Sequence, residues 1–418
     1  MRILIHDYAG HGFTLELARE LAERGSEVLY LHGGGLRASR ASMEPRPGDP
    51  ATLRIQPVGI REPLVSRAGP RRLLQERRYG VRLGSHIIAD RPDVVLSIPS
   101  SLDAQKAAQR AAREVGAGFV YWIQDVYSAA IQQLLGPRFG GAGRLIAAPF
   151  ARLERRLFRT ADSVIAISPD FLPMLDTWGV PSDRIAVIPN WAPLDEIRPL
   201  PRHNAWSAEH DLDGRPVLLY SGTLGRKHDP ELLLALARGL PDANVVVVSE
   251  GAGTGRLGRA DISQVPNLVT LPIQPAARVS EVLASADILV AILDPEATVF
   301  SVPSKVLTYL AAGRPILAAI PEGNLAARTV RDAGAGVTVD PSDAPGFVAA
   351  ARAMFADRTG RDAAGAAGRA HAEAAFAIRG IADSFEEVLR RAADVRTRRG
   401  VATDTASAPD HARPEAKA

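Results

Sequence analysis

Short apolar runs alternate with amphipathic stretches along most of the chain. Residues 3–6 form an apolar run, and leucines and alanines then recur at helical spacing over residues 14–24, before a glycine. This alternation of strand and helix patterns is typical of a parallel sheet covered by helices on both faces. Further strands of the first half are predicted at 28–31, 94–97, 119–123 and 163–167.

The same alternation restarts after Pro199. Strands are predicted at 217–220, 243–248, 268–271, 288–291 and 315–319, with helices between them at about 230–240, 276–284 and 305–312. Two such series predict an α/β protein with two Rossmann-like domains, residues 1–192 and 200–375. The proline-rich stretch 190–199 is the predicted linker, because its apolar residues follow neither the helix pattern nor the strand pattern.

The C-terminal part of the chain reads as one helix followed by a tail. Ile381, Phe385, Val388 and Leu389 form a single apolar stripe within residues 376–394. Residues 395–418 contain almost no large apolar side chain, so this tail is predicted to be disordered.

Composition narrows the functional classes. The 418 residues contain no cysteine, which excludes disulfides, thiolate metal sites and cysteine nucleophiles. The sequence shows no apolar run of about 18 residues and opens on a strand pattern rather than a secretory signal, so we expect a cytoplasmic protein.

A basic and apolar segment occupies residues 61–82. Its arginines are interspersed with leucine, valine and tyrosine, a pattern that suits an amphipathic helix lying on an anionic membrane. A solvated helix face with ordinary core contacts is the alternative, and the sequence leaves both open. Nucleic acid is not an expected partner, since no aromatic residues form a stacking platform among the arginines.

Ligands of open parallel sheets bind where strands run into helix amino termini, and the first such loop is residues 6–14. Gly10, His11 and Gly12 allow a tight turn and close approach to a ligand, and Thr14 is a plausible cap. Leu15 stands where a dinucleotide fingerprint needs glycine, so no nicotinamide cofactor is expected. A plain structural turn remains the alternative.

Two loops of the second half suit a diphosphate. Residues 221–228 place Gly222 and Thr223 before Arg226 and Lys227, which combines backbone donors with positive charge. Residues 300–305 place Ser304 as a cap and Lys305 at the start of a helix, where free N–H groups face an anion.

Two weaker candidates carry carboxylates at strand ends. Glu250, in the loop 249–253, is placed to contact a base or ribose. Asp125 follows the aromatic strand 119–123 and is a candidate for acceptor binding or catalysis. For Asp125, a structural role as the cap of the next helix is an equally good interpretation.

Several stretches, in order, resemble glycosyltransferase family 4, and most of all its bacterial polysaccharide branch, which includes the L-fucosamine transferase of O-antigen synthesis. The resemblance covers about residues 1–335 and is carried by HDYAGHGFTLELARELAERGSEVLYL, WIQDVY, ADSVIAISPDFLPMLDTWGVPSDRIAVIPNWAPLDEIRP, YSGTLGRKHD and SVPSKVLTYLAAGRPILAAIPEGN. It implies a GT-B fold, with two Rossmann-like domains facing a cleft and a last helix that crosses back to the first domain.

The resemblance also implies a retaining transfer from a nucleotide diphosphate sugar. A UDP-linked hexosyl or N-acetylhexosaminyl donor is expected, with guanine nucleotides left open, and a glycan or polyprenyl-linked acceptor. Lys227 would hold the diphosphate, the helix that begins at Ser304 and Lys305 would contact its distal phosphate, and residues 10–12 would close over donor and acceptor. No cofactor is expected. No Asp-x-Asp site follows a donor-domain strand as metal binding requires, so activity should survive a chelator.

The sequence departs from the family pattern at three positions. Thr223 stands where many members have arginine, and Phe300 and Thr308 stand where many have two glutamates. Thr308 is therefore assigned to donor binding in a subfamily variant of the site. A nucleotide-sugar 2-epimerase and a non-catalytic nucleotide-sugar-binding protein remain as alternative functions.

Overall fold

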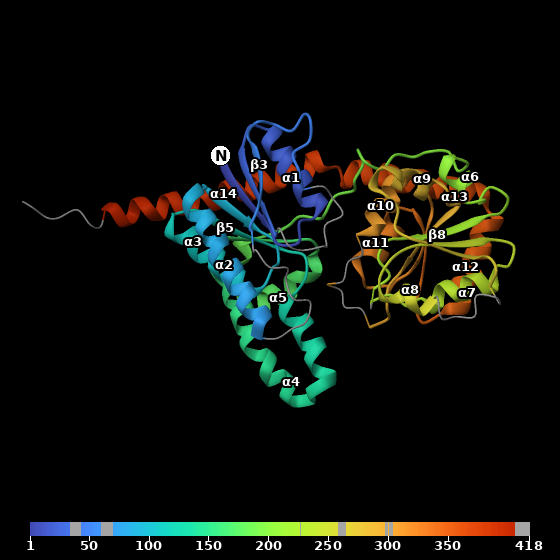
Figure 1. Ribbon diagram of the computed structural model, residues 1–418, viewed down its shortest axis with the longest axis horizontal. Coiled ribbons are helices and arrows are strands. Elements are labelled where there is room, and N and C mark those ends of the chain that lie inside the picture. The colour runs from blue at the N-terminus through green and yellow to red at the C-terminus, as the bar shows by residue number, and fades with distance from the viewer. Residues whose placement is uncertain are drawn as a thin grey trace, which may run out of the picture. The chain divides into compact units, whose positions relative to one another are not determined.

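The computed structural model describes residues 1–33, 43–59, 70–225, 227–257, 265–296, 300 and 304–405, and it divides into two compact units (Figure 1). Unit 1 comprises Met1–Ile167, Leu172–Ile188 and the chain from Ala382 onward, and unit 2 comprises Ser168–Phe171 and Pro189–Ile381. Among the described helices, none has both the length and the apolar character to cross a membrane.

Unit 1 is built on a seven-stranded parallel sheet with the strand order β3-β2-β1-β4-β5-β6-β7. Its strands are β1 (Arg2–Asp7), β2 (Glu27–His32), β3 (Leu53–Pro57), β4 (Val94–Ser97), β5 (Gly118–Ile123), β6 (Ser163–Ala166) and β7 (Ile185–Val187). Its helices are α1 (Gly12–Glu23), α2 (Pro70–Asp90), α3 (Leu102–Glu114), α4 (Tyr127–Thr160), α5 (Leu172–Thr177) and η2 (Ser182–Arg184), and most of α14 (Ile378–Thr405) also belongs to it.

The last helix, α14, completes the core of unit 1. The ring of Phe385 packs edge-on against Trp122 of β5, with the two centroids 4.7 Å apart, and both side chains are buried. The backbone of α14 passes close to Gly118: a Cβ on Gly118 would lie 2.6 Å from the carbonyl oxygen of Ala392. Arg24, just after α1, pairs with Asp383.

Unit 2 is built on a six-stranded parallel sheet with the order β10-β9-β8-β11-β12-β13. Its strands are β8 (Val217–Ser221), β9 (Asn244–Val248), β10 (Leu268–Leu271), β11 (Ile288–Ile292), β12 (Ile316–Ala319) and β13 (Gly336–Val339). Its helices are η1 (Pro169–Phe171), α6 (Ala205–Glu209), α7 (Glu231–Gly239), α8 (Ala252–Leu257), η4 (Ala276–Arg278), α9 (Val279–Ala284), α10 (Lys305–Ala312), α11 (Leu325–Asp332), α12 (Ala344–Ala356) and α13 (Arg358–Ala375). The chain order reverses between β8 and β11, so the crevice beyond their carboxyl ends is where such a sheet binds ligands.

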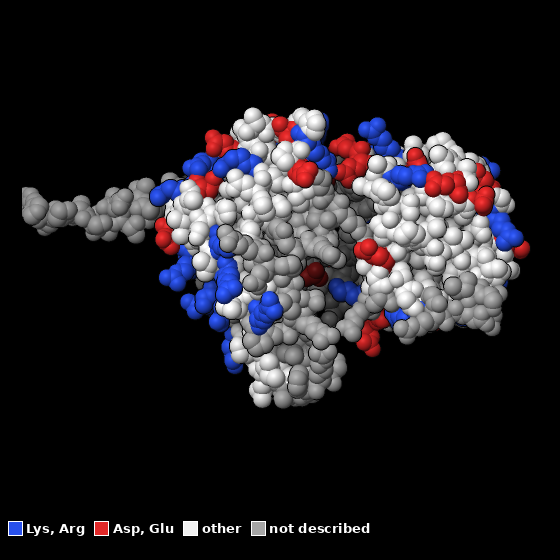
Figure 2. All heavy atoms as spheres, viewed as in Figure 1, with Lys and Arg blue, Asp and Glu red and all other residues white. Residues whose placement is uncertain are grey.

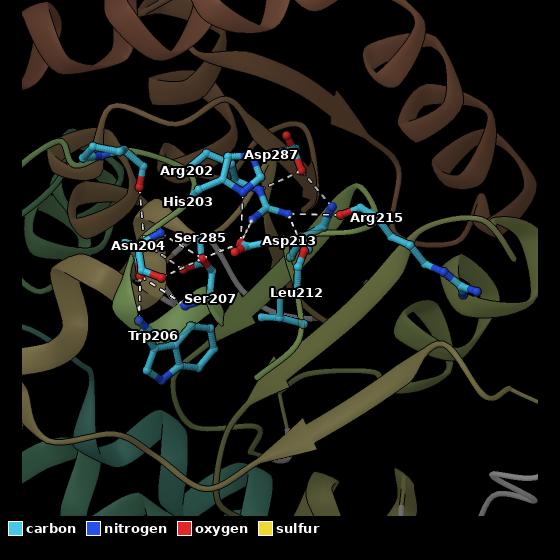
Figure 3. A network of polar contacts seen from close by, with 12 residues as sticks. Arg202, His203, Asn204, Trp206, Ser207, Leu212, Asp213, Arg215, Ser285 and Asp287 are labelled. Carbon is cyan, nitrogen blue, oxygen red and sulfur yellow. Dashed lines mark hydrogen bonds and ion pairs between the residues drawn. The ribbon is translucent and has the colours of Figure 1, made fainter. Parts of the chain in front are cut away.

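A polar network lies at the amino ends of β8 and β11, away from the crevice at their carboxyl ends (Figure 3). The guanidinium of Arg202 donates to Asp287 at 3.0 Å and to the carbonyl oxygens of Leu212 and Arg215. The carboxylate of Asp287 also accepts the backbone N–H of Val217 at 2.8 Å. Asp213, in the turn before β8, accepts from the hydroxyl of Ser207 in the same network. These contacts anchor the chain that enters unit 2.

The structure differs from the sequence expectations mainly at the margins of each element. Strands β3, β7 and β13 were not predicted; they lie at sheet edges and are only partly buried, so their apolar pattern is weak. The predicted linker is also not a free segment, because Ala192 and Ile197 are buried in the core of unit 2. Helix α14 continues to Thr405, beyond the predicted start of the disordered tail at 395. Residues 406–418 lie outside the described part of the chain.

Candidate functional site

The candidate donor site lies at the carboxyl ends of β8 and β11 in unit 2. Gly222 follows β8 with a φ of +119°, a backbone conformation that residues with a side chain rarely adopt. Its N–H donates to the carbonyl of Val248 at the end of β9, and its own carbonyl accepts from the hydroxyl of Ser249 at 2.7 Å. The loop after β8 is therefore held against the loop after β9.

The loop that contains Glu250 braces the diphosphate loop through its backbone. The carbonyl of Glu250 accepts the N–H of Leu224 at 2.8 Å, and the carbonyl of Leu224 accepts the N–H of Gly253 at 2.8 Å. The side chain of Glu250 is exposed at the rim of this loop.

Tyr309, which sequence analysis did not single out, joins α10 to the strand ends. Its buried hydroxyl accepts the N–H of Ser221 at 2.9 Å and lies 3.2 Å from the carbonyl of Val290. One turn of α10 separates Tyr309 from Lys305, so this hydroxyl fixes the helix that presents the lysine. In the sequence Tyr309 looks like an ordinary apolar helix position, which is why it was missed.

Lys305 points into the site rather than into solvent. Its Nζ lies 3.7 Å from the centroid of the Tyr220 ring, is buried, and has no hydrogen-bond partner within the described residues. A Cβ placed on Gly222 would lie 3.8 Å from the same Nζ, so the glycine keeps open the space beside the amine. Burial lowers the pKa of Lys305 to about 7.

Lys227 lies on the rim of the same site. Its side chain is exposed, and its backbone carbonyl accepts the N–H of Asp294 just after β11 at 2.7 Å. The next residue, His228, accepts the N–H of Gly225 through Nδ1 at 3.0 Å. Burial, together with the positive charges of Lys305 and Lys227, lowers the pKa of His228 to about 4, which keeps this imidazole neutral. The side chains of Lys305 and Lys227 therefore both act on His228, and no acidic group is among the causes of the pKa shifts of Lys305 and His228.

The remaining predicted donor residues surround α10. Ser304 occupies the N-cap position, but its hydroxyl makes no capping bond, so the expected side-chain cap is wrong. Thr308 is partly exposed one turn later, and Phe300 packs against Phe171, with centroids 4.9 Å apart. An aromatic contact therefore replaces the carboxylate that many family members carry at this position.

Two further predicted donor residues, Arg226 and Thr223, belong to the loop after β8. Arg226 lies outside the described residues. Thr223 is exposed, and its carbonyl accepts the hydroxyl of Tyr220 at 2.9 Å. In the described part of the chain, no group of three or more His, Asp or Glu residues is arranged to hold a metal ion.

Unit 1 carries its own candidate site, organised by a carboxylate that sequence analysis missed. Asp7, at the end of β1, is fully buried and accepts hydrogen bonds from the N–H groups of Ala9 and His11 and from the hydroxyls of Thr14 and Tyr30. Burial alone would raise the pKa of Asp7, but the bonds from His11 and Thr14 lower it to about 2. The loop of residues 10–12 is thus wound around one buried negative charge.

His11 is the outward-facing member of this cluster. Its Nδ1 lies 3.0 Å from Asp7, while about half of its side chain is exposed. Although burial lowers it, the pKa of His11 is raised overall by the hydrogen bond to Asp7 and by the charges of Asp7 and Asp125. Asp125 itself is exposed. The predicted residues His11 and Asp125 therefore act on each other, although β4 lies between their strands.

Two predicted caps in unit 1 are wrong. Thr14 lies inside α1 and donates to Asp7, whereas His11 takes the N-cap position. Asp125 does not cap α4: the N–H groups of Tyr127 and Ser128 donate to the buried carboxylate of Glu154, which returns to this point because α4 folds back on itself (Figure 1).

Comparison with known proteins covers both units. Residues 12–196 match the family model described as Glycosyltransferase Family 4, and residues 215–357 match the one described as Glycosyl transferases group 1. The chain belongs to glycosyltransferase family 4. This assignment confirms the resemblance that the sequence motifs indicate.

Two curated relatives of this family 4 chain come from bacteria. It is 25% identical over 252 residues to WcaI of Escherichia coli K12, a protein named for colanic acid biosynthesis, and 27% identical over 200 residues to WbjE of Pseudomonas aeruginosa, named as a glycosyltransferase. These matches cover 58% and 46% of this chain, and 62% and 50% of the relatives' own lengths.

Solved structures confirm the GT-B fold of this family 4 chain. Sucrose-phosphate synthase from Thermosynechococcus elongatus superposes with a TM-score of 0.72 at 15% identity, covering 94% of this chain and 98% of that one. HepE from Anabaena, solved in complex with UDP, superposes with a TM-score of 0.67 at 14% identity, covering 93% of this chain and all of that one.

Proposed function

We propose that this chain is a retaining glycosyltransferase that moves a hexosyl or N-acetylhexosaminyl group from a UDP-sugar to a glycan or lipid-linked acceptor in cell-surface polysaccharide synthesis. The observation that supports this most is the buried amine of Lys305, which has no hydrogen-bond partner among the described residues and lies with Lys227 near His228 at the switch point of the unit 2 sheet. A buried amine without a partner suits a doubly charged leaving group.

The mechanism that fits this site is electrostatic. As the bond between the sugar and the diphosphate breaks, negative charge grows on the diphosphate oxygens, where the side chains of the two lysines are already in place. Such preorganised groups stabilise a transition state without reorganising during the reaction. The acceptor oxygen bonds to the anomeric carbon as the bond to the diphosphate breaks, and the leaving diphosphate takes the acceptor proton, so the reaction needs neither a protein nucleophile nor a protein base.

The acceptor is assigned to unit 1. His11, on the loop that Asp7 organises, and Asp125, on the loop after β5, present exposed side chains at the carboxyl ends of the strands. A hydroxyl acceptor can donate to either group. The ordering of the first loop by Asp7 limits the entropy lost when an acceptor is oriented.

Donor class is tested by thermal unfolding in the presence of single nucleotide sugars, with EDTA in every sample. A UDP-sugar at about 100 times its dissociation constant should add about 2.7 kcal/mol of stability, while the matching GDP-sugar should add none. The stabilising donor is then incubated with a lipid extract and without it. Transfer that needs the extract supports the proposal, whereas conversion of the donor alone would indicate an epimerase, and binding without any conversion a non-catalytic protein.

We also propose that unit 1 contacts the inner face of a membrane through α2. Figure 2 shows Lys and Arg side chains gathered on unit 1 over this helix. The exposed positions of α2 combine arginines with large apolar side chains and include no acid up to residue 89; besides Ser85 and Ala89 they are Arg71, Leu73, Leu74, Arg77, Arg78, Val81, Arg82 and Ile88. The acidic residue of this stretch, Glu76, is buried and paired with Arg72. An anionic bilayer suits a face of this kind.

Charge reversal tests the membrane proposal. The double variant Arg78→Glu with Arg82→Glu should weaken binding to phosphatidylglycerol vesicles by about tenfold or more, since each cation near the surface contributes roughly 1 kcal/mol. Arg238→Glu with Arg358→Glu makes the same change in net charge on exposed helices of unit 2 and serves as the control. Equal loss in both variants, or no binding of the unaltered protein to these vesicles, would contradict a docking face on α2.

A further inference from the structure

Lysine is rare in this chain, and its placement is informative. Only four of the 50 basic residues are lysines, at positions 106, 227, 305 and 417, and the others are arginines. Two of these four lie at the candidate donor site. Arginine stays charged under all conditions that a protein tolerates, whereas a lysine amine can lose its proton when it is buried.

The surroundings of Lys305 favour an amine that has lost its proton. Its Nζ is buried and, among the described residues, has neither a hydrogen-bond partner nor a carboxylate that compensates a charge. The face of the Tyr220 ring, 3.7 Å away, attracts an ammonium, but burial outweighs this contact and lowers the pKa of the amine. An unpaired buried charge is costly, so a buried lysine neutralises instead. Among the described residues, the titratable groups near it are Tyr220, under its Nζ, His228, whose pKa Lys305 lowers, and Tyr309, one helical turn away. None of them is an anion near neutral pH, because burial raises the pKa of both tyrosines and His228 is neutral.

We propose that Lys305 is held without a proton in the empty donor site and takes one up from solvent when a pyrophosphate enters, so that donor binding and protonation form one coupled step. This inference rests on the proposed function of the site as a nucleotide-sugar site. The pyrophosphate supplies the anionic partner that the described residues do not provide. The lone pair of Nζ accepts a proton, and the resulting ammonium donates a hydrogen bond to a phosphate oxygen.

The coupling sets a definite pH dependence. With a pKa of about 7 in the empty site, about one Lys305 in eleven carries a proton at pH 8, so binding should take up about 0.9 proton. The dissociation constant should rise about eightfold between pH 7.5 and 8.5. The terminal phosphate of UDP ionises near pH 6 and His228 near pH 4, so neither contributes in this range.

Calorimetry with UDP measures this uptake directly, in two buffers of different ionisation enthalpy at pH 8. Lys305→Arg keeps a permanent cation, and it should bind UDP with no proton uptake and with an affinity that does not change between pH 7.5 and 8.5. Lys227→Gln is the matched comparison: its affinity should fall, while the uptake of about 0.9 proton should persist. Uptake that is absent in the unaltered protein, or unchanged in Lys305→Arg, would overturn the inference.

A second measurement needs no variant that affects folding. With four lysines, a sample labelled with ¹³C at the lysine Cε should give few resonances, and one should titrate with a midpoint near 7. Saturating UDP should move that midpoint upward by more than one pH unit. A midpoint that stays put while UDP binds would contradict the coupling and leave the donor site intact, whereas failure of UDP to bind at all would contradict the proposed function itself.

Discussion

Replacement of Lys227 by alanine is expected to reduce turnover at saturating donor by about 10²-fold or more. The exposed ammonium stands on the rim of the diphosphate site, where charge grows as the sugar leaves, and loss of one preorganised charge partner has an effect of this size. The backbone carbonyl of residue 227 still accepts from Asp294 in the variant, so the loop keeps its anchor. Single-turnover measurements with the donor identified by thermal shift give the rate of the chemical step.

Lys106→Ala is the control for this experiment. Lys106 is exposed on α3 of unit 1, so its removal changes the net charge equally without touching the donor site. Its turnover should match that of the unaltered protein. If Lys227→Ala also turned over at the unaltered rate, Lys227 would have to be removed from the proposed mechanism.

Asp7→Asn is expected to destabilise unit 1 by about 2–4 kcal/mol. The buried carboxylate accepts at least four hydrogen bonds, and an amide presents N–H groups to donors that need an acceptor. Denaturant unfolding at pH 7 measures the change in the free energy of unfolding. Asp176→Asn, at an exposed position of α5, should change this free energy by less than about 0.5 kcal/mol.

The pH dependence of the Asp7 effect has a definite sign. Because the folded-state pKa of about 2 lies below the usual value of 3.8, the carboxylate stabilises the fold above about pH 4, and this contribution of about 2 kcal/mol is lost as the pH falls towards 2. The difference between the unaltered protein and Asp7→Asn should therefore shrink over that range. A difference that is constant from pH 7 to pH 2 would show that the charge of Asp7 is not what holds the loop.

The central strands of both sheets could be predicted because burial on both faces makes them continuously apolar. Strands β1, β4, β5 and β11 are of this kind, and their runs are unmistakable in the sequence. At the sheet edges this signal fails. Strand β3 alternates Arg54 and Gln56 with apolar residues, and β7 has only three residues, so neither differs enough from loop sequence.

In the candidate sites, too, residues with a local sequence signal could be predicted, and residues whose partners are distant in the sequence could not. The strand-end loops that contain Gly222 and Lys227 could be found because glycine and cations follow apolar runs. The role of Asp7 could not, since its partners include Tyr30, 23 residues away, which comes close only once β1 and β2 pair. The sequence likewise does not show that the buried amine of Lys305 has no hydrogen-bond partner among the described residues, because this depends on how the folded chain surrounds it.

The return of α14 to unit 1 has a consequence for biosynthesis. A ribosome that has released residues 1–188 has made all seven strands of the first sheet but not the helix that covers Trp122. Trp122 lacks its contact with Phe385 while the whole of unit 2 is translated, which takes about 10–40 s at ordinary elongation rates. The nascent first unit therefore has to tolerate an open apolar groove, or recruit a chaperone to it, until Phe385 emerges.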